Sequence, residues 1–125
     1  MTKYSDIPFL RHEIEGLNTE ISTFTRVLAE MPSFKTKCAD LIKLLKQSRT
    51  EYMQRHAELV RELDAIKADN QEVYEMIYFH DLKNFTWEQA FNRLSAGIYS
   101  EAPKHYCIHV VTRYLEKYGY VKNES

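Results

Sequence analysis

The feature that most constrains this chain is a pair of long stretches in which apolar side chains recur every three or four residues. The first stretch covers 10–31 and the second covers 42–66. An alternating spacing of three and four is the heptad pattern of helices that pack on another helix along one side. We call the recurring positions the seam: Leu10, Ile14, Leu17, Ile21, Phe24, Leu28, Ile42, Leu45, Arg49, Tyr52, His56, Leu59, Leu63 and Ile66.

The two stretches are separated by Pro32 and Ser33, and a proline at this place ends the first helix. We therefore predict an antiparallel helical hairpin. A first helix of ~23 residues would be ~35 Å long and a second of ~35 residues ~52 Å long. The end of the longer helix must then pack on the C-terminal part of the chain or on a second chain, so the mismatch indicates either internal docking or a homo-oligomer. The pattern alone does not distinguish a hairpin within one chain from a bundle of several.

Arg49 and His56 are the polar members of the seam. A polar seam residue fixes register or oligomeric state at a cost in stability, or it marks the place where the partner helix ends.

A second part of the chain, 69–125, has the pattern of three short helices. Its sharpest boundary is at Thr86, which is followed three residues later by Gln89, the spacing of a capping box. Apolar residues then recur with helical spacing at Trp87, Ala90, Phe91 and Leu94. The glycine at 97 is typical of the end of this helix.

A helix is also predicted on each side of the capping box. Asp69 or Asn70 is suited to open the one upstream, and Ser100 with Pro103 is suited to open the one downstream, which Gly119 closes. Three helices in this order are typical of a helix-turn-helix module. The sequence therefore predicts an all-α fold, with a hairpin in 1–68 and a helix-turn-helix-like module in 69–125.

Few residues suggest chemistry. Cys38 and Cys107 lie far apart and form no metal or disulfide motif, and His105 with His109 stands at i, i+4 without a third ligand at a recognisable spacing. We therefore predict no catalytic residue, no metal and no cofactor. No apolar run approaches the ~18 residues of a membrane-spanning helix, so we expect a cytoplasmic protein that does not contact a membrane.

Part of the module resembles a known family. The segments 78–82 (YFHDL) and 85–90 (FTWEQA) are similar to the R-Y-x-x-G-L-T-W-E-E-I-A segment of ArpU/RinA-type late-gene regulators of phages. The segments 106–109 (YCIH) and 113–117 (RYLEK) are similar to the Y-R-I-H…R-A-L-E-K pattern of their last helix. Where members have basic residues at the start of that helix, this chain has 101–103 (EAP).

The resemblance implies a transcription regulator of phage type, acting on double-stranded DNA in the cytoplasm of a bacterial host. Its module would be similar to region four of sigma factors, and it would act as a dimer whose two recognition helices occupy adjacent major grooves. The predicted DNA-binding residues form the polar face of the last helix: Lys104, His105, His109, Thr112, Arg113 and Lys117.

The charge of the module favours an alternative. Residues 70–125 carry six Lys or Arg against seven Asp or Glu, a net charge of −1, which is no electrostatic footprint for nucleic acid. The alternative is a helical interaction protein of phage or mobile-element origin that inhibits or recruits a bacterial protein without binding DNA.

Overall fold

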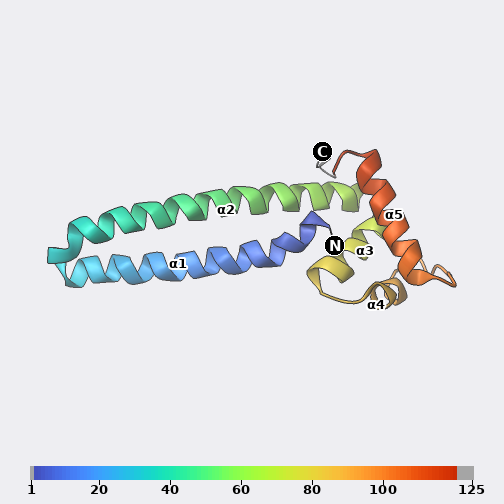
Figure 1. Cartoon of the computed structure of the whole chain (residues 1–125), viewed down its shortest axis with the longest axis horizontal. Coiled ribbons are helices and arrows are strands. Elements are labelled where there is room, and N and C mark those ends of the chain that lie inside the picture. The colour runs from blue at the N-terminus through green and yellow to red at the C-terminus, as the bar shows by residue number, and fades with distance from the viewer. Residues whose placement is uncertain (1, 121–125) are drawn as a thin grey trace. The chain divides into compact units, whose positions relative to one another are not determined.

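The computed structural model describes residues 2–120, and every regular element in that range is helical (Figure 1). In chain order the elements are a 3₁₀ turn (Lys3–Ser5), α1 (Asp6–Glu30), a 3₁₀ turn (Pro32–Phe34), α2 (Lys35–Asp69), α3 (Gln71–Ile77), a π-helical turn (Tyr78–Leu82), α4 (Trp87–Asn92) and α5 (Pro103–Lys117). The prediction of an all-α fold, with a long hairpin followed by three shorter helices, is confirmed. Residues 121–125 of the predicted module lie outside the described residues.

The seam closes within one chain. Helices α1 and α2 run antiparallel on either side of the break at Pro32 (Figure 1). No seam residue is exposed, but Met31, which ends the first apolar stretch, is 53% exposed. The guanidinium of Arg49 on α2 donates from Nη1 to Oδ1 of Asn18 on α1, at 2.9 Å. This polar seam residue therefore links the two helices of the hairpin.

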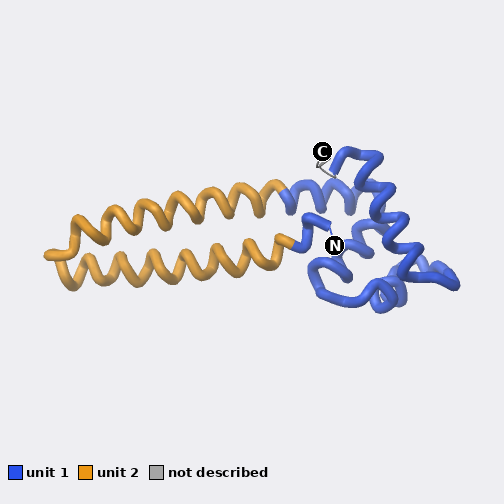
Figure 2. Tube along the Cα trace, in the orientation of Figure 1, with its two compact units in different colours: residues 1–5, 59–125 blue, residues 6–58 orange. Residues whose placement is uncertain are grey.

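The chain divides into two compact units, shown in different colours in Figure 2. The hairpin unit comprises 6–58, and the module unit comprises 1–5 together with 59–125. The last turns of α2 thus belong to the module unit. The boundary between the units lies at 58/59, ten residues before the position 68/69 that the sequence predicts. The reason is that Leu59, Leu63 and Ile66 are fully or almost fully buried and form part of that unit's core.

The core of the module unit combines this end of α2 with the short helices. It contains Tyr4, Leu59, Leu63, Ile66, Val73, Met76, Ile77, Ala90, Leu94, Cys107, Val111, Tyr114 and Leu115. The overhang of the longer helix, which the sequence left to be packed either on the module or on another chain, is packed in the module unit. The N-terminal segment joins it there, because the Tyr4 hydroxyl donates to Oε2 of Glu62 at 3.1 Å.

The predicted helix starts are correct at two places and wrong at a third. Asn70 caps α3 by accepting from the Val73 amide, and the capping box of Thr86 and Gln89 is complete. Ser100 does not cap α5; the N-cap is Ala102, and Ser100 Oγ accepts from the Ala102 amide. Proline at the first position of α5 replaces this cap, since its ring sets a helical φ and it has no amide to satisfy.

Helix α4 is shorter than predicted and ends at Asn92. Leu94, which continues the apolar spacing, is buried although it lies outside the helix. Gly97 adopts φ +61°, and an extended ten-residue connection leads from α4 to α5. This connection is longer than the three- or four-residue turn of a typical helix-turn-helix.

Gly16 lies in the interior of α1, and a methyl group added at its Cα would meet nothing within 4 Å. We predict that Gly16→Ala raises the free energy of unfolding by about 0.5–1 kcal/mol, because alanine loses less backbone freedom on folding. Chemical denaturation monitored by circular dichroism measures this change. Gly97→Ala is the control and should destabilise, because its φ is positive. Destabilisation by Gly16→Ala would contradict the prediction and show that this side of α1 is covered.

Candidate nucleic-acid interface

One side of α5 holds the helix in the module. Cys107, Val111 and Leu115 are buried, and the helix packs on α3 and α4. Of the other apolar and aromatic residues toward the end of the helix, Tyr114 is buried, Val110 is partly buried and Tyr118 is 48% exposed. The buried residues recur every three to four positions, so the opposite side of the helix faces outward.

The six residues predicted to bind DNA are all exposed: Lys104, His105, His109, Thr112, Arg113 and Lys117. All but Lys104 lie on this outward side. Lys104 stands three and seven residues before Cys107 and Val111, which places it on the buried side of the helix. His105, His109, Thr112 and Arg113 line one shallow hollow on the surface of α5, together with Ile108 and Glu116. Lys117 borders a neighbouring hollow with Arg113 and Glu116, and Lys104 lines neither. The face therefore combines cations and hydrogen-bonding groups with one carboxylate and one apolar side chain.

Cations on neighbouring segments are held on aromatic rings. The Arg93 guanidinium lies 4.3 Å from the ring centre of Phe85, and Lys83 Nζ lies 5.4 Å from that of Tyr78. Arg113 makes no ion pair with another described residue. Among the basic residues of this face, its fork of donors is therefore the one best suited to bind a phosphate or a guanine edge.

Two tyrosine hydroxyls fix α5 on the rest of the module. Tyr106 donates to Oε1 of Glu72 on α3, and Tyr114 donates to Oδ2 of Asp69 at the end of α2, both at 2.6 Å. The bond to Glu72, together with burial, raises the pKa of Tyr106 to about 12. Burial and the bond to Asp69 likewise raise the pKa of Tyr114. Both tyrosines therefore stay protonated and donate over the physiological pH range.

Glu75 is a buried carboxylate that links α3 to the segment after α4. It accepts from the amide of Ser95 at 3.0 Å, from the Ser95 hydroxyl at 2.5 Å and from the Gln71 amide group at 3.3 Å. Burial acts to raise the pKa of Glu75, but the bonds from Ser95 and Gln71 outweigh it, so the pKa lies below its ordinary value. The sequence analysis did not identify this residue; its only signal is an acidic residue within the apolar run of α3.

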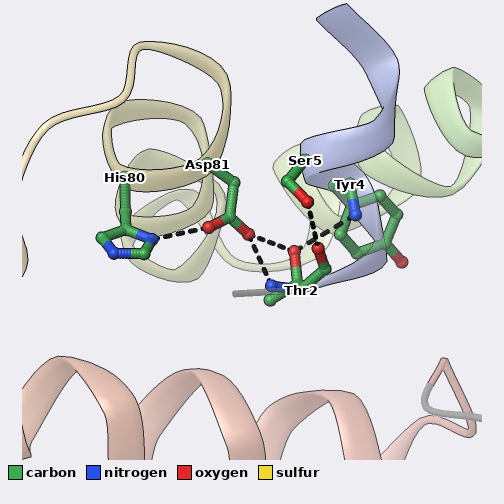
Figure 3. Close-up of polar contacts among 5 residues, drawn as sticks. All are labelled: Thr2, Tyr4, Ser5, His80 and Asp81. Carbon is green, nitrogen blue, oxygen red and sulfur yellow. Dashed lines mark hydrogen bonds and ion pairs between the residues drawn. The ribbon is translucent and has the colours of Figure 1, made fainter. Parts of the chain in front are cut away.

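Asp81 is the second buried carboxylate and ties the N-terminal segment to the π-helical turn (Figure 3). It accepts from the amide of Thr2 at 2.9 Å, from the Thr2 hydroxyl, and from Nδ1 of His80 at 2.5 Å. The ring of His80 stacks on Trp87, with centres 3.6 Å apart. Asp81 lies between the imidazole and the hydroxyl, whereas in a nucleophilic triad the imidazole lies in the middle. The geometry is that of a structural clamp, and no local sequence signal predicted it.

Two further properties of the described residues bear on function. No group of three or more His, Cys, Asp or Glu side chains is placed to hold a metal ion within residues 2–120. In the same range, no helix has the length and apolar character needed to cross a membrane.

Comparison of the chain with protein-family models, with curated proteins and with solved structures found no match in any of the three. The function therefore has to be argued from the geometry of the chain itself.

We predict that Glu75→Gln lowers the free energy of unfolding at pH 7 by about 1.5–3 kcal/mol, because a carboxylate accepts the Ser95 donors more strongly than an amide does. The contribution of Glu75 is present above its ordinary pKa of 4.5 and is lost as the pH falls through its lower folded pKa. Denaturation of the native protein and the variant from pH 3 to 7 should show that the difference between their free energies of unfolding disappears below pH 4.5. Glu88→Gln, at an exposed position of α4, is the control. A difference in the free energy of unfolding that is absent at pH 7, or constant down to pH 3, would contradict the role assigned to Glu75.

Burial raises the pKa of the Cys107 thiol to about 11, whereas Cys38 is partly exposed. We predict that a thiol reagent modifies Cys38 rapidly and Cys107 only on unfolding, because the reactive thiolate of Cys107 is both scarce and covered. Absorbance of a released chromophore measures the two rates. In the Cys38→Ser variant the rapid phase should disappear. Rapid modification of both cysteines in the folded native protein would show that α5 is not packed as described.

Proposed function

We propose that this chain binds double-stranded DNA through the outward face of α5 and acts, as a dimer, as a transcription regulator of phage type. One observation carries the proposal: five of the six residues that the sequence singled out are exposed on one side of a helix whose opposite side is anchored in the core. The order α3, α4, α5 supports it, because the last helix of such a module enters the major groove.

Each type of residue predicted to bind DNA has a role in the proposal. Arg113 is suited to a bidentate contact with guanine or phosphate, and Lys104 and Lys117 to phosphate. His105, His109 and Thr112 supply further hydrogen-bonding groups. Glu116 lies beside Arg113 and opposes the approach of a phosphate, so the affinity of one module should be low and two modules are needed.

The alternative remains a protein-binding function without DNA, and one observation favours it. Large apolar side chains are exposed on both units, including Ile108 on the proposed DNA-binding face and Leu44 on the hairpin, the latter 61% exposed. Exposed apolar groups of this kind are typical of surfaces that bind protein.

The test is titration of the purified full chain into fluorescent duplexes of mixed sequence over a series of salt concentrations. We predict that the chain binds these duplexes and that the logarithm of the binding constant falls linearly with the logarithm of the salt concentration. Arg113→Ala should weaken binding and reduce the slope by about 0.9 for each phosphate that the variant no longer neutralises.

Two variants sharpen this test. Glu116→Gln should strengthen binding, because it removes a negative charge beside Arg113 without changing the size of the side chain. Lys67→Ala, at an exposed position of α2 outside both α5 and the hairpin unit, should leave both affinity and slope unchanged. The absence of binding at low salt, or an equal effect of Lys67→Ala and Arg113→Ala, would overturn DNA binding by α5 and favour the alternative.

A further inference from the structure

The hairpin unit has very little core of its own. Of its 53 residues, only Ile7, Leu10, Ile21 and Ile42 are buried apolar residues, against thirteen among the 66 described residues of the module unit. Other seam residues, such as Leu17 and Phe24, are only partly buried. Two helices bury one side of each other and leave their flanks open, and helical hairpins commonly complete their core as four-helix bundles.

Apolar side chains also occupy the open surface of the hairpin. Leu41 and Leu44 stand three residues apart on the same side of α2, and both are exposed. Met31 and Phe34 are exposed at the tip, where the two helices are joined. The opposite end, the base, exposes Phe9 on α1 and Met53 on α2. Both ends of the hairpin therefore present apolar surface that the chain itself does not cover.

The charge of the hairpin is divided between these two ends. The tip half, residues 21–50, carries six Lys or Arg against two Asp or Glu, a net charge of +4. The base half, residues 6–20 with 51–58, carries two Lys or Arg against six Asp or Glu, a net charge of −4. The one ion pair among described residues of the hairpin joins neighbours on α2, Arg55 and Glu58, so the lysines of the tip have no such partner there.

We propose that the hairpins of two chains associate antiparallel, so that the tip half of each lies against the base half of the other. A symmetric pair of this kind places +4 against −4 twice, whereas pairing tip to tip places +4 against +4. It also brings the exposed apolar residues of the tip half, such as Leu44, toward Phe9 of the second copy. The proposal rests on the dimeric state included in the proposed function, and not on DNA binding.

The first test reverses charge in one half at a time, with self-association of the full chain measured by light scattering without DNA. Lys37→Glu with Lys43→Glu brings the tip half to zero, and Glu15→Lys with Glu51→Lys does the same for the base half. All four side chains are exposed, so folding should be unaffected. Each double variant should weaken self-association at least about tenfold, the effect of about 1.4 kcal/mol.

An equimolar mixture of the two double variants should associate more tightly than either alone, because one of its two contacts again opposes +4 and −4. The control is Lys67→Glu with Lys83→Glu, which changes the charge equally at exposed positions outside the hairpin unit and should have no effect. Leu44→Gln tests the apolar contribution and should weaken the dimer without changing the helical content.

The second test measures the relative direction of the two hairpins with a spin label on Cys38. This residue lies near the tip and is the more accessible cysteine. Since α1 is ~37 Å long, an antiparallel pair should separate the two labels by about 25–30 Å, and a tip-to-tip pair by less than about 20 Å. A short distance, a monomer at every concentration in low salt, or an equal loss in the control variant would each overturn the proposal. A chain that remains monomeric while still binding DNA would leave the DNA-binding function standing and remove only the dimer.

Discussion

The difference in length between α1 and α2 is the constraint on which the rest of the structure depends. Eleven residues of α2, from Leu59 onward, extend beyond the hairpin unit with apolar side chains that must be covered. Helix α3 alone is seven residues long and could not form a core. The short helices fold because α2 supplies them with Leu59, Leu63 and Ile66, so that one helix contributes to the packing of both units.

Buried polar groups then specify how the short helices are arranged. Glu75 joins α3 to the connection that follows α4, Asp81 joins the π-helical turn to the N-terminal segment, and Glu72 and Asp69 accept from the tyrosines of α5. A buried carboxylate without donors is costly, so an alternative packing that separated Glu75 from Ser95 would be penalised. Apolar contacts tolerate several arrangements of small helices, whereas these hydrogen bonds favour one.

The sequence predicts the elements of this fold better than their contacts. Periodicity and capping residues identify the hairpin and the starts of α3 and α4, because these signals are local. The outward face of α5 is equally predictable, since the period of a helix places His109 and Arg113 opposite Cys107 and Val111. The early end of α4 is not, because Leu94 keeps the helical spacing while its backbone has already left the helix. The clamp on Asp81 has no local signal at all, because Thr2 lies 79 residues away in the sequence.

The clamp also bears on how the chain assembles as it is synthesised. Thr2 and Tyr4 bind Asp81 and Glu62, residues that leave the ribosome long after the N-terminal segment does. Closing so long a loop in an unfolded chain is entropically costly, whereas the hairpin forms from contacts nearer in sequence. Once formed, it brings residue 5 back toward residue 59 and removes most of that cost. The first residues to be translated are therefore among the last to reach their native contacts.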